Sequence, residues 1–232
     1  MDLLWDGARQ ALLLLLHGDR EVIEITLRSL AVSAAATLLS LAFGVPLGMA
    51  LALARFPGRG LLLALVNTGM GMPPVVVGLV IALLLWRSGP LGALGLLYTP
   101  MAMVLAQAVL AFPLVAGLTA GAVQSLPPRL RLQILALGAS RLQMLWLLAR
   151  EARLLLLAAL IAAFGAAISE VGASLQVGGN IKGETRVLTT AIVLETGKGN
   201  FELAMALALI LLLLVFTVTI LFTALQQRAR RA

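Results

Sequence analysis

Long uncharged apolar runs dominate this sequence, and they limit what the chain can fold into. No charged residue occurs in residues 88–128, and none occurs in residues 29–54 or 203–225. A helix that crosses the hydrocarbon core of a bilayer needs about 20 mostly apolar residues. With 61% hydrophobic and only 12% charged residues, the chain lacks the polar groups that a soluble surface requires. We therefore expect an all-α integral membrane protein, surrounded by membrane lipid.

Five apolar runs are long enough to predict membrane spans, and together they form a single transmembrane domain over residues 1–232. The fourth run is the least regular, because only about 24 Å of helix separates Arg153 from Glu170, so this helix must extend past a charge. Residues 1–28 are expected to begin with an amphipathic helix at the membrane interface, anchored by Trp5, and not with a cleavable signal peptide. The five predicted spans are 29–54, 61–86, 101–123, 144–170 and 203–225.

The charges between the spans select an orientation, because Lys and Arg accumulate on the cytoplasmic side of membrane proteins. If the C-terminus is cytoplasmic, the inner loops and tail hold ten basic residues and one acid, Glu151, whereas the outer segments hold seven bases and nine acids. We therefore expect the N-terminus outside, residues 125–143 (the inner segment) in the cytoplasm, and residues 172–200 (the outer segment) outside. This distribution accounts for the net charge of +7 without nucleic-acid binding. The ten inner bases are Arg55, Arg59, Arg129, Arg131, Arg141, Arg150, Arg153, Arg228, Arg230 and Arg231.

The second span is predicted to contain a break near mid-bilayer. Two consecutive prolines, Pro73 and Pro74, remove two helix hydrogen bonds, so the freed carbonyls must meet protein or water. Asn67 and Thr68 lie shortly before them. Either this break faces a central pathway or it is a packed kink, and the sequence favours neither interpretation.

The outer segment is rich in Gly, Thr and Asn. Glycine turns leave free backbone amides that can bind an anion, and neutral hydroxyls give the weak hydrogen bonding that a transport path needs. Glu170, at the membrane boundary, is expected to pair or to face water, and a salt bridge to Arg186 is the simplest structural explanation for it. The candidate path or gate residues in this region are Glu170, Gly178, Gly179, Asn180, Thr185, Arg186, Thr189 and Thr190.

No catalytic or metal-binding signature is found. The sequence has one histidine and no cysteine, so a thiolate metal site is impossible. The glycines around Lys198 lack the spacing of a phosphate-binding loop. We expect a protein that is not an enzyme by itself and that holds neither a cofactor nor a metal.

The inner segment is basic and amphipathic, with Leu130, Ile134 and Leu135 near helical spacing before Gly138. It resembles the cytoplasmic loop of the permease subunits of type I ABC importers. The glycine and the apolar positions match that family's loop motif, whereas its acidic residue and its proline are absent. In the family this loop sits in a groove of an ATPase. The docking residues that the resemblance implies are Arg129, Leu130, Arg131, Ile134, Leu135, Gly138, Ala139, Ser140 and Arg141.

A more specific resemblance lies in residues 169–173 and 179–185. They are similar to two conserved segments of the molybdate permeases, and Val171 and the run G-G-N-I-K-G are closer to the tungstate permeases. The resemblance covers about residues 26–225. It implies the type I importer permease fold, a homodimer in a prokaryotic plasma membrane, and a path between the two copies. It also implies two cytoplasmic ATPase subunits that bind ATP and Mg, and an extracytoplasmic oxyanion-binding protein.

Three functions remain open from the sequence. The first is the translocation subunit of an ATP-driven importer for tungstate, with molybdate, sulfate or another anion as close alternatives. The second is a stand-alone secondary transporter, but the chain has no visible repeat and only Glu170 as an acid near the membrane. The third is a structural membrane protein whose basic loop only sets topology.

Overall fold

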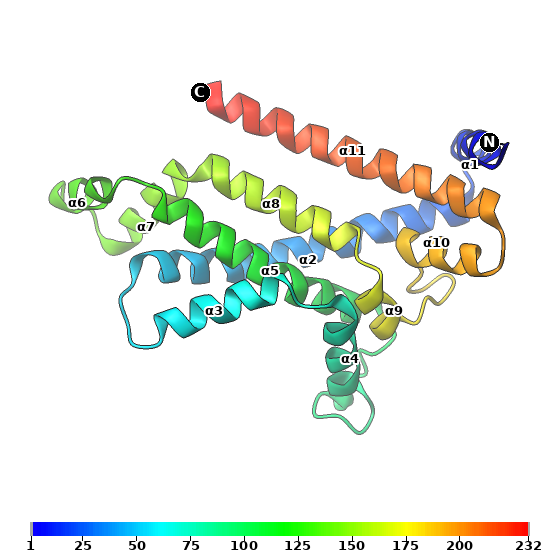
Figure 1. Ribbon diagram of the computed structural model, residues 1–232, viewed down its shortest axis with the longest axis horizontal. Coiled ribbons are helices and arrows are strands. Elements are labelled where there is room, and N and C mark those ends of the chain that lie inside the picture. The colour runs from blue at the N-terminus through cyan, green and yellow to red at the C-terminus, as the bar shows by residue number, and fades with distance from the viewer. Residues whose placement is uncertain (1, 232) are drawn as a thin grey trace.

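The computed structural model describes residues 2–231, and within this range it describes all side chains except those of residues 2–4, 8, 15 and 229–231. Met1, the first residue of the predicted interfacial segment, lies outside the described range, as do the side chains of the predicted inner bases Arg230 and Arg231. All regular structure in the described range is helical (Figure 1). The elements are α1 Asp2–His17, α2 Arg20–Leu53, α3 Arg59–Met70, α4 Pro74–Leu85, the 3₁₀ turn η1 Gly92–Leu94, α5 Pro100–Gln124, α6 Pro128–Ala136, α7 Arg141–Glu151, α8 Arg153–Ile168, α9 Gly172–Gly178, α10 Leu188–Gly197 and α11 Phe201–Arg231.

Three of the described helices, α2, α5 and α11, are each long and apolar enough to cross a membrane. Two further pairs of helices meet this criterion only together. The pair α3 and α4 is bent by 104°, and the pair α7 and α8 by 72°. The chain therefore has three such spans, or up to five if each bent pair counts as one.

The predicted break in the second span is confirmed. Residues 71–73 separate α3 from α4, and α4 starts at Pro74 after the extended residue Pro73. Figure 1 shows α4 projecting from the side of the bundle, while α3 packs against α5. The expectation that one helix carries the fourth span past a charge is wrong, because the chain bends at Ala152, between α7 and α8.

The centre of the fold is the pair α2 and α5, which make the most extensive contact between two helices. Glycines allow this approach, since a Cβ atom added at Gly44 would lie 2.8 Å from Val115 Cγ1, and one at Gly48 would overlap Thr119 and the Ala116 carbonyl. Small residues at such positions let the backbones of membrane helices come close.

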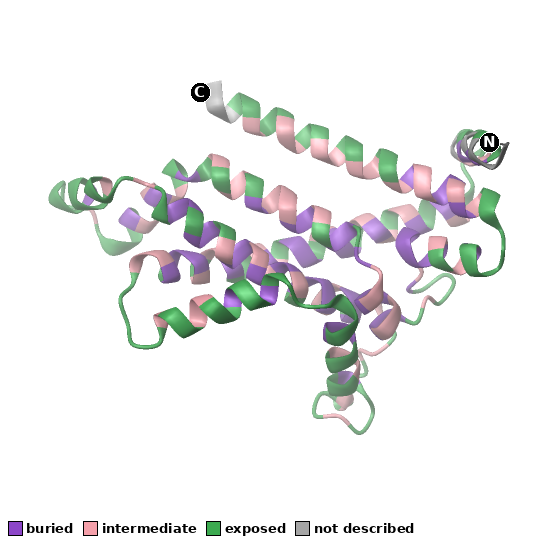
Figure 2. Cartoon of the chain, viewed as in Figure 1, coloured by how far each residue is buried: buried purple, intermediate pink, exposed green. Residues whose placement is uncertain are grey.

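The remaining helices surround this pair. Both α8 and α9 pack against α5, and α9 also packs against α4, whereas α1 and α10 pack against the N-terminal part of α11. Figure 2 shows buried residues concentrated where α2, α5 and α9 meet, mostly exposed residues along α4, and alternating exposed and intermediate residues along most of α11. In a bilayer, lipid covers apolar faces of this kind.

Candidate functional site

Glu170 caps the N-terminus of α9. Its side chain is buried, with 7% of the residue exposed. One carboxylate oxygen accepts a hydrogen bond from the backbone N–H of Ala173 (2.6 Å), and the other accepts from the backbone N–H (2.9 Å) and the hydroxyl (2.6 Å) of Ser174. The first N–H groups of a helix have no partner within the helix, so this carboxylate satisfies them locally.

The predicted salt bridge between Glu170 and Arg186 is wrong. Arg186 instead forms an ion pair of 3.2 Å with Glu21, at the start of α2. The physical reason is that α9 already satisfies the Glu170 carboxylate. The amides of α9 lie three and four residues from Glu170 and reach both of its oxygens, whereas Arg186 follows a turn that carries it to the outer end of α2.

A buried chain of hydrogen bonds leads from Glu170 across the centre of the fold. The Ser174 hydroxyl, which donates to Glu170, accepts from Gln107 Nε2 on α5 (3.1 Å). The Ser33 hydroxyl on α2 donates to Gln107 Oε1 at 3.3 Å. The sequence did not lead us to Ser33, Gln107 or Ser174. An amide inside an apolar span, such as Gln107, is the signal that indicates a network of this kind, because such a group must find a partner within the membrane.

One side of the α3–α4 break is packed against α9. A Cβ atom added at Gly172 would lie 2.8 Å from Val75 Cγ2, and one at Gly78 would lie 2.6 Å from Ala173 Cα. This side of the break is therefore structural packing, while the prediction that the break faces a pathway stays a prediction. The four residues predicted to face a path here are all exposed: Asn67, Thr68, Pro73 and Pro74.

The outer segment is a folded part of the molecule and not a solvent loop. Gly179 (φ +69°) and Asn180 (φ +53°) both adopt left-handed backbone conformations that turn the chain after α9. Asn180 Nδ2 donates to the Thr190 carbonyl at 3.3 Å, while its buried Oδ1 has no partner among the described atoms. The Thr185 hydroxyl donates to the Gly178 carbonyl and accepts from the Ile181 amide at 2.9 Å.

The threonines predicted to line a path point into the segment itself. The Thr189 hydroxyl donates to the Glu170 carbonyl at 3.0 Å, and the Thr190 hydroxyl accepts from the Val187 amide at 3.1 Å. Gly178 packs so closely on α5 that a Cβ atom there would lie 2.8 Å from Met103 Sδ. These residues build the turn, and few of the path candidates in the outer segment are exposed.

Opposite charges meet on the outer side, between the outer segment and the start of α2. Glu21 pairs with Lys182 (2.6 Å) as well as with Arg186, and Arg28 donates to the carbonyls of Arg186 (3.0 Å) and Gly183 (2.7 Å). Glu21 thus pairs with both bases of the outer mouth but offsets only one of their two positive charges.

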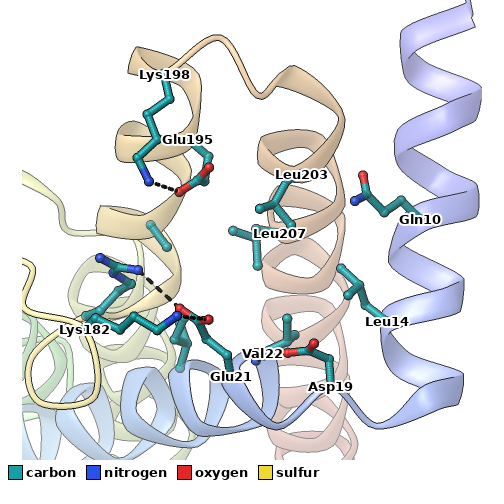
Figure 3. A pocket seen from close by; sticks show the side chains of 13 residues that line it. Gln10, Leu14, Asp19, Glu21, Val22, Lys182, Glu195, Lys198, Leu203 and Leu207 are labelled. Atoms are coloured by element: carbon teal, nitrogen blue, oxygen red, sulfur yellow. Dashed lines mark hydrogen bonds and ion pairs between the residues drawn. The ribbon is translucent and has the colours of Figure 1, made fainter.

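A pocket of about 500 Å³ lies beside these ion pairs, between α1, the start of α2, α10 and α11 (Figure 3). Its lining includes three acids, Asp19, Glu21 and Glu195, and three bases, Lys182, Arg186 and Lys198. Hydrogen bonds from Asn200 (2.7 Å) and Lys198 (2.8 Å) hold the pKa of the Glu195 carboxyl below its ordinary value. Because the charges balance, this pocket does not favour an anion over a cation.

The inner segment contains α6 and the start of α7, joined by a turn in which Gly138 is the turn residue. Gly138 has a φ of +84°, which only glycine adopts without strain. The amides of Gly138 and Ala139 donate to the carbonyls of Leu135 (3.0 Å) and Ile134 (3.4 Å), which is the Schellman ending of a helix. Ser140 then caps α7 through a reciprocal pair of hydrogen bonds with Gln143.

The predicted docking residues divide into two groups. Ile134 is buried against Met49, Val123, Met144 and Leu148, and Leu130 packs against the same cluster. These two side chains therefore belong to the core of this chain. Leu135 is 39% exposed, and Arg129, Arg131, Ser140 and Arg141 are exposed, whereas Ala139 is half-buried.

Three exposed leucines in the same region were not predicted. Leu132 is 68% exposed, Leu137 is 87% exposed, and Leu142 is 77% exposed. The helical spacing before Gly138 suggested one apolar face, but that face packs against α2 and α7. Leu132, Leu137 and Leu142 lie outside that packed face.

The family model for the inner membrane component of binding-protein-dependent transport systems matches residues 44–231. The chain belongs to this family.

Individual relatives agree with this assignment. The permease shares 40% identity over 227 residues with the tungstate uptake system permease protein TupB of Peptoclostridium acidaminophilum, which covers 98% of this chain and 100% of that protein. It shares 48% identity over 186 residues with a probable anion ABC transporter permease protein of Haloferax volcanii, covering 78% of this chain and 80% of the relative.

Solved structures show the same fold. A structure of the MetNI methionine ABC transporter superposes on the permease with a TM-score of 0.71 at 21% identity, and the match covers 91% of this chain and 97% of that one. The permease therefore has the type I ABC importer permease fold and is a multi-pass protein of the inner membrane. Its relatives are described as permease proteins of an anion ABC transporter and of a tungstate uptake system.

Proposed function

We propose that this permease is the translocation subunit of an ATP-driven importer for tungstate. The observation that carries the proposal is the 40% identity to a tungstate permease across the full length of both chains. Molybdate is the close alternative, because the two oxyanions have almost the same charge and size. The outer segment suits either anion, since its polar groups are mostly neutral and Glu21 offsets only part of the positive charge of Lys182 and Arg186.

A second copy of the chain completes the pathway in this proposal. The α4 helix is apolar throughout and leaves the bundle at 104° to α3, with Val76, Val80 and Leu83 about half exposed. A partner covers part of this surface, and the path lies between the two copies. The exposed polar residues at the end of α3, Asn67 and Thr68, are then candidates for its lining.

An ATPase docks on the inner segment. The exposed residues of α6 and of the following turn, which include Arg129, Leu132 and Leu137, form the surface for a groove on that partner. The ATPase subunits bind ATP and Mg, and their closure moves the helices as rigid bodies. An extracytoplasmic binding protein delivers the oxyanion to the side of the outer segment.

Uptake into proteoliposomes tests this function. Permease, ATPase and binding protein are reconstituted together, and tungstate uptake is measured with ATP inside and with molybdate or sulfate as competitor outside. We expect ATP-dependent uptake of tungstate, with stronger competition by molybdate than by sulfate. Uptake by the permease without any ATPase would show a stand-alone carrier. A preference for molybdate over tungstate by the complete system would overturn the substrate assignment.

A further inference from the structure

Two adjoining cavities at the inner end of the molecule form one cleft. The first, of about 620 Å³, lies between the end of α2, α6 and the start of α7, and Arg55, Arg131 and Arg141 line it. The second, of about 470 Å³, continues along α2. The two share Leu53, Ala54, Arg131, Arg141 and Met144.

The first half of the cleft carries positive charge without compensation. Its three arginines are exposed, none of them forms an ion pair with another described residue, and no Asp or Glu lines either cavity. Arg131 is fixed in place by a hydrogen bond of 3.0 Å from Nη1 to the Leu53 carbonyl. The pocket on the outer side differs, because three acids balance its three bases. Three uncompensated guanidinium groups select an anion, and their planar geometry suits phosphate oxygens.

The second half of the cleft is apolar and reaches into a membrane-crossing helix. Val45, Pro46, Met49 and Ala50 line it from α2, and Leu142 and Leu145 line it from α7. Residues 45–53 of α2 cover about 12 Å along the helix axis. A water-soluble partner does not fill an apolar groove at that depth, whereas an acyl chain does.

We propose that this cleft binds one anionic phospholipid of the cytoplasmic leaflet. Its phosphate group lies among Arg55, Arg131 and Arg141, and one acyl chain lies along Met49 and Ala50. Basic pockets next to membrane helices on the cytoplasmic side recognise anionic headgroups through the same chemistry. The lipid then joins the end of α2 to α6 and α7, and this role does not depend on which oxyanion the permease transports.

Lipid binding to the purified full-length chain tests the site. Native mass spectrometry measures retention of phosphatidylglycerol and of phosphatidylcholine, each titrated into detergent-solubilised protein. We expect phosphatidylglycerol to bind more tightly than phosphatidylcholine, and Arg55→Gln to weaken its binding about fivefold. Ala50→Trp, which fills the apolar half, should abolish it. The matched controls are Arg87→Gln and Ala224→Trp, which change an exposed arginine and an exposed alanine elsewhere and should have no effect.

Three results would overturn the proposal. The first is equal retention of the two lipids, and the second is unchanged phosphatidylglycerol binding in Arg55→Gln. Arg55 lies in the exposed turn between α2 and α3, so this variant is informative even if Ala50→Trp does not fold. The third is displacement of phosphatidylglycerol by inorganic phosphate or tungstate, together with full binding of those anions to Ala50→Trp. That result would make the cleft a site for a free anion and not for a lipid.

Discussion

The carboxylate of Glu170 accepts a hydrogen bond of 2.6 Å from the Ser174 hydroxyl, one turn further along the chain. Together with the two backbone bonds from α9, this contact occupies both oxygens of a buried acid at the edge of the membrane. A buried carboxylate with its oxygens already engaged repels a passing oxyanion and offers it no donor. Glu170 therefore positions α9, and α9 in turn packs against the α3–α4 break.

Replacing Glu170 tests this positioning role. Glu170→Ala leaves two amides and one hydroxyl of α9 without their acceptor, and we expect it to destabilise the permease by about 1–3 kcal/mol. Glu170→Gln keeps one acceptor oxygen and should have a smaller effect. Thermal unfolding in detergent measures the stability, and uptake measures the function. If Glu170→Gln unfolds like the wild type but does not transport, the charge itself acts in the path.

Gly138 provides a test of the turn in the inner segment. A Cβ atom added there meets no atom within 4 Å, so a side chain acts only through the left-handed backbone. We expect Gly138→Val to disturb the turn by about 1–2 kcal/mol and to reduce copurification of the ATPase. Gly138→Asn is the control, because Asn tolerates this conformation and should retain the partner. Equal copurification with all three residues would argue against a docking role for the turn.

The exposed leucines make a further prediction about ATPase docking. Leu132→Glu and Leu137→Glu place a charge on the exposed side of the inner segment, and each should weaken ATPase binding at least about tenfold while the permease stays folded. Ile134→Ala, on the buried side, should instead destabilise the permease by about 2–5 kcal/mol. Surface plasmon resonance measures the affinity for the ATPase, and thermal unfolding measures the stability of the permease. Together they separate the two effects. Strong docking by both Glu variants would exclude this face.

Glu195 makes stability depend on pH on the outer side. Hydrogen bonds from Asn200 and Lys198 lower its pKa below the ordinary value of 4.5 in the folded protein. Its contribution to stability is therefore complete above pH 4.5 and is lost as the pH falls towards the lower folded pKa. Glu195→Gln should lower the unfolding temperature at neutral pH, and the difference from the wild type should shrink below pH 4.5. Glu184→Gln, at an exposed acid of the same segment, is the control.

The sequence predicted the straight helices well and the bent ones poorly. The uncharged runs are sufficient to identify α2, α5 and α11, because a membrane helix needs little more than length and apolar composition. Pro73 and Pro74 indicated a break but not its angle of 104°. Nothing local indicates the bend of 72° at Ala152, since no proline or glycine lies there and packing against other helices sets the angle.

The candidate site shows the same limit. Residue types pointed to the outer segment, but the partners that decide which way its side chains face come from distant parts of the chain. Glu21, which pairs with Arg186 and Lys182, is more than 160 residues away from either, and the Ser29 hydroxyl on α2 accepts from the Leu188 amide at 2.8 Å. In the inner segment, spacing identified an apolar face but not that Leu130 and Ile134 pack within this chain, and the docking role of the segment stays a prediction.

The contact between α1 and α11 joins the first helix of the chain to the last. Within the described range, α1 is synthesised before the other helices, whereas α11, on which it packs, is synthesised after α2 and α5. The α1–α11 contact therefore cannot form until both helices of the α2–α5 centre have been made. Early termination within α11 would leave α1 without its partner while sparing the centre.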